Sequence, residues 1–195
     1  AVIHFAGLKA VGESQQIPLA YFDNNIAGSI SLVQAMQRAQ VFKLVFSSSA
    51  TVYGENNPSP YQEDMPLNMP NNNYGYTKLV VEQMLEKAAI ADERWSIALL
   101  RYFNPVGAHK SGQIGEDPLG IPNNLMPFVT QVAVGLREKL CIFGNDYDTA
   151  DGTCERDFIH VVDLAKAHVL AIQNRLNHQG CRAWNIGTGQ PISVL

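Results

Sequence analysis

A tyrosine and a lysine four residues apart, Tyr74 and Lys78, stand in the stretch "NNNYGYTK" at the start of a predicted helix. Side chains four residues apart lie on the same face of a helix, one turn above the other. A free tyrosine has a pKa of about 10 and is a poor base at neutral pH. A neighbouring ammonium group and the positive end of the helix both favour the phenolate. The pair therefore indicates a proton acceptor that works near neutral pH.

Oxidation of an alcohol is the chemistry that such a base serves. A serine hydroxyl from the stretch "FSSSATVYG" can share the proton of the tyrosine if the two segments meet. The oxidation also needs a hydride acceptor, which amino-acid side chains cannot supply. The residues therefore predict an enzyme that carries a redox cofactor.

Alternating strand and helix patterns must position these residues. Strands are expected at residues 1–5, 43–49 and 96–103, and helices at residues 17–39 and 76–90, the second capped by Asn73. Farther on, helices are expected at residues 125–136 and 162–176, and short strands at residues 139–143, 156–161 and 183–187. Repeated strand–helix–strand units predict a parallel sheet with helices on its faces.

Three predicted strands end in distinctive segments, at residues 5–9, 47–54 and 101–108. Open parallel sheets bind their ligands at the carboxyl ends of their strands. We therefore expect these segments and the helix of Tyr74 to converge on one edge of the sheet.

Composition excludes several other classes of protein. Hydrophobic residues make up 46% and charged residues 16% of the chain, values typical of a globular domain. The net charge of −4 and the lack of a basic block disfavour binding to nucleic acid or to an anionic membrane, and no apolar run is long enough to span a bilayer. The five histidines share no metal-ligand spacing, so no metal site is expected: His4, His109, His160, His168 and His178.

Three cysteines, Cys141, Cys154 and Cys181, lie far apart in the chain. An odd, scattered set fits a reducing compartment such as the cytoplasm better than a disulfide framework. The chain opens on an apolar strand pattern and stops in an apolar stretch. We therefore expect it to be an internal part of a longer protein.

In this order, several segments resemble the UDP-glucose 4-epimerase family, in the extended branch of the short-chain dehydrogenase/reductase superfamily. The segments are "FAGLKAVGES", "YFDNN", "FSSSATVYG", "YGYTKLVVE", "RYFNPVGAH", "NNLMPF", "FGNDYDTADGT" and "RDFIHVVDLA". The resemblance implies an α/β fold: a Rossmann-like doubly wound parallel sheet without its first strands, and a smaller mixed α/β region. Residues 1–104 would form part of the NAD-binding domain, and residues 105–195 mostly a substrate-binding region with segments that return to the main sheet. The complete protein would be a homodimer.

The resemblance also implies the role of each matching residue. Tyr74 would be the proton acceptor, Lys78 would lower its pKa and bind the nicotinamide ribose, and Ser49 would bridge Tyr74 and the sugar. Besides these three residues, the NAD site would include Phe5, Ala6, Gly7, Leu8, Lys9, Asn24 and Phe103. The UDP-sugar substrate would contact Ser49, Tyr74, Asn104, Asn124, Leu125, Cys141, Ile142, Phe143 and Arg156. Ser47 and Ser48 are expected to be turn residues.

The implied activity is NAD-dependent interconversion of UDP-glucose and UDP-galactose. The family's glycine-rich phosphate loop is missing from this sequence, so an inactive truncated form is one alternative. A 4-epimerase of another UDP-sugar, an N-acetylhexosamine, a pentose or a uronate, is a second. Related dehydratases place an Asp-Glu pair where this chain has Ala50 and Thr51, and decarboxylases place Glu at the second of these positions. Both reactions are therefore disfavoured.

Overall fold

The computed structural model describes residues 1–175 and 177–195. The chain divides into two compact units, one of residues 1–102 and 166–186, the other of residues 103–165 and 187–195. The expected division at residue 104 into a cofactor-binding and a substrate-binding part is a functional one, and it stays a prediction. Among the described residues, no helix is long and apolar enough to cross a membrane.

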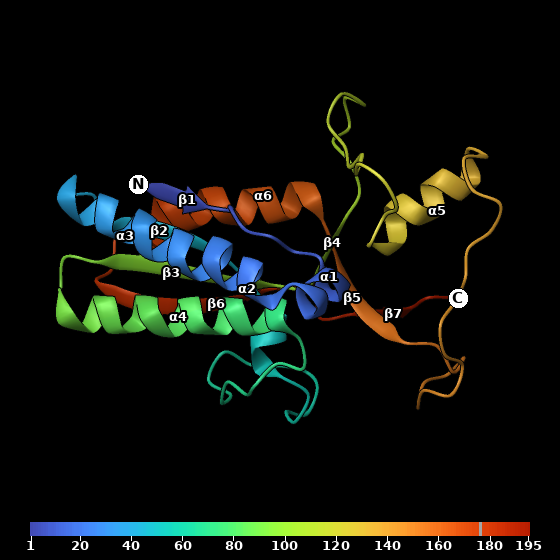
Figure 1. The fold of residues 1–195 in the computed structure, drawn as a ribbon, viewed down its shortest axis with the longest axis horizontal. Coiled ribbons are helices and arrows are strands. Elements are labelled where there is room, and N and C mark those ends of the chain that lie inside the picture. The colour runs from blue at the N-terminus through green and yellow to red at the C-terminus, as the bar shows by residue number, and fades with distance from the viewer. Residues whose placement is uncertain (176) are drawn as a thin grey trace. The chain divides into compact units, whose positions relative to one another are not determined.

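A four-stranded parallel sheet forms the centre of the first unit (Figure 1). Its strands are β1 (Val2–His4), β2 (Lys43–Ser49), β3 (Ser96–Tyr102) and β6 (Gly180–Ile186). They lie in the order β1-β2-β3-β6, and all neighbours are parallel. The parallel sheet predicted from the alternating pattern is confirmed, and β2 has the predicted bounds.

Helices cover both faces of this sheet. The N-terminal ones are α1 (Val11–Gln16), α2 (Pro18–Tyr21), the π-helix η1 (Phe22–Ala27) and α3 (Gly28–Arg38), followed by the 3-10 helix η2 (Ala50–Tyr53) and α4 (Asn73–Ala91). Near the C-terminus lie α6 (Val161–Leu170) and the π-helix η3 (Ala171–Arg175). The helix expected at residues 17–39 is thus three consecutive pieces. Leu176, the last residue of the helix expected at 162–176, lies outside the described residues.

The strands are buried on both faces, which explains their continuous apolar runs. Leu44, Phe46 and Leu99 point toward α3 and α4, where Val33 and Leu85 complete the larger part of the core. The alternate strand residues, among them Val45, Ala98 and Leu100, pack on the other face against Ala171 of η3. Figure 1 shows α3 and α4 on one side of the strands and α6 on the other. The sheet therefore holds the ends of β1, β2 and β3 in a fixed register.

The second unit contains a small mixed sheet. The sheet consists of β4 (Asn104–Val106), β5 (Glu155–His160) and β7 (Pro191–Ser193), and the unit also contains the helix α5 (Leu125–Ala133). β5 lies in the middle, parallel to β4 and antiparallel to β7. The combination of a helix and strands in this region is as predicted.

The strand predicted at residues 139–143 is wrong. This segment has no regular secondary structure, and Phe143 is 85% exposed. Its apolar side chains line a cavity instead of joining a sheet. A short apolar run in the sequence can therefore predict a strand although the segment lines a cavity.

Candidate active site

The first turn of α4 is held by two neighbouring asparagines. The side chain of Asn72 caps the helix by accepting a hydrogen bond from the backbone N–H of Gly75, at 2.7 Å. The cap expected at Asn73 is therefore wrong by one residue. Asn73 instead donates through Nδ2 to the carbonyl of Ser14 at 3.0 Å and to Oε1 of Gln15 at 2.6 Å. These contacts tie the start of α4 to α1.

A glycine allows the start of α4 to approach the end of β2. A Cβ atom at Gly75 would lie 2.8 Å from Cβ of Pro70 and 3.2 Å from Cβ of Thr51, closer than ordinary contact. Thr51 belongs to the turn that Ser49 caps by accepting a hydrogen bond from its N–H at 3.3 Å. The close approach brings Ser49 near enough to Tyr74 for its side chain to lower the pKa of the phenol.

Lys78 lies one turn farther along α4 and is only 7% exposed. Its Nζ donates a hydrogen bond to the carbonyl of Ser47 at 2.8 Å. The same nitrogen lies 4.9 Å from the ring centroid of Phe46 and 5.8 Å from that of Tyr74. The three residues singled out for proton transfer thus gather around the carboxyl end of β2.

The environment of Tyr74 disfavours its charged form. Burial raises the pKa of Tyr74 to about 12, and the neighbouring phenol of Tyr102 acts in the same direction. A hydrogen bond with Ser49 opposes this rise in the pKa because it favours the phenolate, and Tyr21 adds a smaller rise. The protein groups alone therefore hold Tyr74 as a neutral phenol at pH 7.

Lys78, which is expected to lower the pKa of Tyr74, is itself affected by burial. Burial lowers the pKa of its ammonium group to about 8, although Glu82 acts in the opposite direction. With this pKa, Lys78 still carries its charge at pH 7. Its amine also donates to the carbonyl of Ser47, so its nearest partner is not the phenol.

Ser47 and Ser48, expected to be turn residues, are instead buried strand residues with partners. The Ser47 hydroxyl is hydrogen-bonded to the phenol of Tyr102 on β3, and the Ser48 hydroxyl donates to Oε1 of Glu82. Side chains alternate across a strand, so Ser47 and Ser49 share one face and Ser48 takes the other. This alternation was the available signal that the three serines have different functions.

A buried ion pair that sequence reasoning missed lies beneath this end of the sheet. Glu82 and Arg101 are 0% and 3% exposed at their side chains, and their closest atoms, Oε2 and Nη2, are 2.7 Å apart. Nη1 of Arg101 donates to the hydroxyl of Tyr53 at 3.0 Å, and that hydroxyl donates to Oδ1 of Asn185 at 2.7 Å. The bonds of Arg101 to Glu82 and Tyr53 raise its pKa, so the guanidinium stays charged. The recurrence of polar residues every four positions, at 74, 78 and 82, was the signal for Glu82.

The segment after β1 is held by Asn25 of η1, another residue that the sequence did not single out. Oδ1 of Asn25 accepts from the N–H of Leu8 at 2.8 Å. Nδ2 donates to the carbonyl of Leu8 and to Oγ1 of Thr77, each at 3.0 Å. Asn25 therefore links residues 5–9 to α4, immediately beside Lys78, whereas the predicted Asn24 is exposed.

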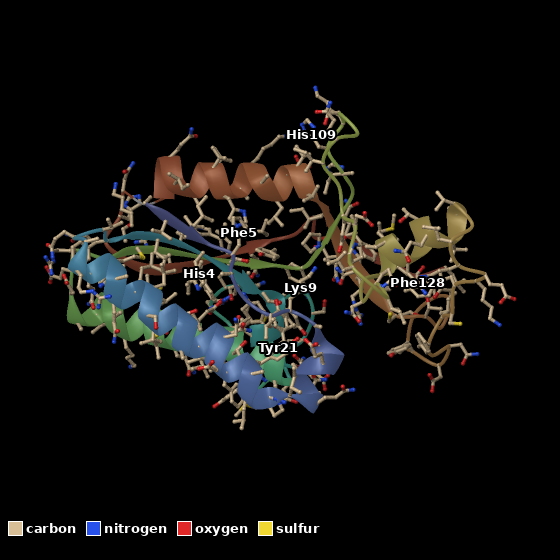
Figure 2. The ribbon with its side chains drawn as sticks, turned by 45° about the horizontal axis from the view of Figure 1, so that its top comes forward. His4, Phe5, Lys9, Tyr21, His109 and Phe128 are labelled. Atoms are coloured by element: carbon tan, nitrogen blue, oxygen red, sulfur yellow. The ribbon has the colours of Figure 1, made fainter. Side chains whose placement is uncertain are left out.

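Side chains on the two sides of β1 and its loop differ in exposure. His4 is buried, and its Nε2 is 2.8 Å from the hydroxyl of Ser29 on α3. Phe5 is 57% exposed, and its ring stacks on His168 of α6 at 4.7 Å. Figure 2 shows His4 and Phe5 directed to opposite sides, with Lys9 farther along the same segment. Residues 5–7 and Lys9 are exposed at the end of the sheet, which fits a surface that holds a cofactor.

The second unit gathers a separate set of the predicted residues. A cavity of about 280 Å³ is lined by Asn104, Asn124, Leu125, Cys141, Ile142, Phe143 and Arg156, together with neighbours from β4, α5 and β5 and with Val194. Phe103 belongs to the same unit and packs beside Gly187. A cavity with three amides, those of Asn104, Asn123 and Asn124, one guanidinium and apolar side chains suits a ligand that combines a charged group with a flat ring.

A parallel sheet covered by helices on both faces, with serine, tyrosine and lysine side chains at the end of one strand, defines a Rossmann-like protein of the short-chain dehydrogenase type. Residues 1–187 match the model of the NAD dependent epimerase/dehydratase family. The chain belongs to this family.

Individual relatives are similar over the whole chain. The UDP-glucose 4-epimerases of Bacillus subtilis and Dictyostelium discoideum are 62% and 60% identical over 100% of this chain, which covers 57% of each of them. A crystal structure of UDP-glucose 4-epimerase from Bifidobacterium longum in complex with NAD+ and UDP matches with a TM-score of 0.95 at 53% identity, over 99% of this chain and 57% of that one. The chain thus spans a little over half the length of these relatives.

Proposed function

We propose that the protein interconverts UDP-glucose and UDP-galactose by NAD-dependent oxidation and re-reduction at C4 of the sugar. The observation that carries the proposal is the gathering of Ser49, Tyr74 and Lys78 at the end of β2. Extensive similarity to UDP-glucose 4-epimerases, one of them solved with NAD+ and UDP, supports the choice of cofactor and substrate.

Residues of the first unit would hold the cofactor and move one proton. When bound, NAD supplies the oxidising and reducing equivalents for C4 and a positive charge that favours phenolate. Residues 5–9, all exposed except Leu8, would line its site together with Asn24 and Phe103. Tyr74 would take the proton of the C4 hydroxyl and return it later, while Ser49 would orient that hydroxyl. Lys78, held by the carbonyl of Ser47, would contact the ribose.

Residues of the second unit would hold the UDP end of the substrate. Arg156 has a planar, two-pronged donor group that fits a diphosphate, and the amides of Asn104 and Asn124 can donate to phosphate oxygens. Leu125 and the segment 141–143 would pack near the nucleoside. If these contacts hold the UDP end while the sugar end is free to turn, both faces of the 4-keto sugar can be presented in one site. That freedom is what inversion at C4 requires.

A direct assay tests the proposal. Purified protein should convert UDP-galactose to UDP-glucose without net consumption of NAD, and Tyr74→Phe should abolish most of this conversion. No conversion by a folded protein that binds NAD and UDP would contradict the proposal.

The sugar specificity is a separate question. A UDP-Glc/GlcNAc 4-epimerase from Campylobacter jejuni matches with a TM-score of 0.82 at 40% identity, so N-acetylated sugars are the second candidate substrates. Parallel assays with UDP-galactose and UDP-N-acetylgalactosamine distinguish the two.

Two further proposals concern the state of the protein in the cell. We place it in the cytoplasm because its three cysteines are all free, one of them exposed. We also propose a homodimer, which light scattering on the purified protein would test. Residues 1–104 would mainly serve the cofactor and residues 105–195 the substrate.

A further inference from the structure

The side chain of Asp157 on β5 holds the turn that leads into β7. Its carboxylate accepts hydrogen bonds from the N–H of Thr188 at 2.9 Å, from the hydroxyl of Thr188 at 2.7 Å and from the N–H of Gly189 at 2.8 Å. Three donors on two neighbouring residues thus converge on one carboxylate. Hydrogen bonds to a charged acceptor are shorter and stronger than those to a neutral one.

Backbone hydrogen bonds alone do not hold β7 against β5 at the position of Asp157. Asp157 is opposite Pro191 in the antiparallel register of β5 and β7. Proline has no N–H, so Pro191 cannot donate a hydrogen bond to β5. The side chain of Asp157 instead accepts hydrogen bonds from Thr188 and Gly189, three and two residues before Pro191. Because β7 has only three residues, this attachment is a large part of what joins β7 to β5.

The carboxylate of Asp157 is closely packed against Gly187. A Cβ atom at Gly187 would lie 2.5 Å from Oδ2 of Asp157 and 2.9 Å from Cδ2 of Phe103. Both distances are too short for real atoms, so only glycine fits between the carboxylate and the aromatic ring. The packing therefore restricts Asp157 to a narrow range of positions.

Arg156 precedes Asp157 on the same strand. Side chains of consecutive residues point to opposite sides of a strand, so Arg156 lines the cavity while Asp157 holds the turn. The side chain of Arg156 is exposed and is bonded through Nη1 to the neighbouring carbonyl of Glu155 at 2.7 Å. The position of its guanidinium thus depends on the strand from which it projects.

We propose that Asp157 is a positioning residue for substrate binding: it fixes β5 so that Arg156 meets the diphosphate of a UDP-sugar. The inference rests on the proposed function, because it assigns the diphosphate to Arg156. Asp157 touches neither substrate nor cofactor and acts through the strand. The class of ligand affected is the nucleoside diphosphates, not nucleosides in general.

Asp157→Asn in the full-length protein tests this role with little change in shape. One acceptor oxygen becomes an NH2 group that faces the donors of Thr188 and Gly189. Affinity for UDP, measured by calorimetry, should fall about tenfold, the loss expected when one hydrogen bond to a charged group is misaligned. Affinity for uridine, measured by competition, should stay the same because uridine has no phosphate for Arg156 to bind.

Asp151→Asn is the matched control. Asp151 is another carboxylate of the second unit, and it accepts hydrogen bonds from the N–H of Thr153 at 2.8 Å and from its hydroxyl at 2.7 Å. Its loss should leave UDP affinity unchanged. Thr188→Val removes one of the donors from Asp157, and it should weaken UDP binding in the same direction by a smaller factor even if Asp157→Asn does not fold.

Three results would overturn the inference: unchanged UDP affinity in Asp157→Asn or Thr188→Val, an equal loss for UDP and uridine, or an equal loss in Asp151→Asn. The last two would mean that the unit is loosened as a whole. A wild-type protein that binds no UDP would instead refute the proposed function, so the two failures are distinguishable.

Discussion

Replacing Lys78 with methionine should stabilise the protein at neutral pH while it removes activity. Burial lowers the pKa of Lys78 from 10.5 to about 8, a difference of about 2.5 units. Each unit corresponds to about 1.4 kcal/mol, so the buried ammonium reduces the free energy of unfolding by about 3 kcal/mol at pH 7. Methionine keeps an apolar chain against Phe46 but loses the hydrogen bond to the carbonyl of Ser47, worth about 1 kcal/mol. The net expected gain is about 2 kcal/mol.

The sign of the pH dependence follows from proton binding. The unfolded chain keeps the Lys78 proton up to pH 10.5, whereas the folded protein releases it near pH 8. Between these values the unfolded state binds more protons, so the stability of the wild type rises with pH. The advantage of Lys78→Met should therefore be largest below pH 8, and by about pH 10.5 the variant should be slightly less stable than the wild type because only the loss of the hydrogen bond remains.

Urea unfolding at a series of pH values from 6.5 to about 10.5 measures this difference. Lys87→Met is the matched control, because Lys87 is exposed on the same helix and its replacement should change stability by less than about 0.5 kcal/mol. The reasoning fails if Lys78→Met is less stable than the wild type at pH 7. It also fails if the difference between the two proteins is the same at pH 7 and pH 10.

Three further substitutions test other parts of the site. Tyr74→Phe should lower kcat by about 10²–10⁴-fold, the contribution of a general base, with an unchanged circular dichroism spectrum; near-normal turnover would remove Tyr74 from the mechanism. Gly75→Ala should reduce the free energy of unfolding by about 1–3 kcal/mol and lower activity, since a Cβ there would lie 2.8 Å from Pro70; denaturation at the wild-type midpoint would contradict this crowding. Glu82→Gln should lower the free energy of unfolding by about 3–5 kcal/mol because the Arg101 charge stays buried without its partner. Thermal unfolding of the double variant Glu82→Gln, Arg101→Met should show a smaller loss of stability, and equal losses would mean that the pair is not coupled.

Much of the first unit could be predicted from the sequence because its strands are buried on both sides. Residues 43–49 form a continuous apolar run closed by serines, and β2 has these bounds. The spacing of Tyr74 and Lys78 on one helix was equally visible. The segment 139–143 has a similar apolar pattern, but its residues 141–143 are exposed and line a cavity, and a pattern of residue types cannot separate the two cases.

Contacts between distant residues account for what the sequence did not reveal. Glu82 and Arg101 are 19 residues apart, and Asn25 and Thr77 are 52 apart. The four-residue spacing marks Glu82, but nothing local in the chain marks its partner or the pair of Asn25 and Thr77, because both contacts depend on how η1, β3 and α4 lie in space. The lowered pKa of Lys78 was missed for the same reason: it results from burial of the ammonium group, which depends on the fold.

Tyr74, Lys78 and Glu82 form a stripe along one face of α4, so their contacts depend on the number of residues between them. A helix turns by about 100° per residue, so inserting or deleting one residue between Tyr74 and Glu82 would rotate one end of the stripe away from β2. Substitutions within this segment change a single side chain, whereas a change in its length separates the base from its lysine and the lysine from its buried counter-charge. In the irregular loop at residues 54–72, side chains do not have to lie on a common helix face, so its length can change. Variation in length among proteins with this site should therefore accumulate in that loop and be absent from the nine residues from Tyr74 to Glu82.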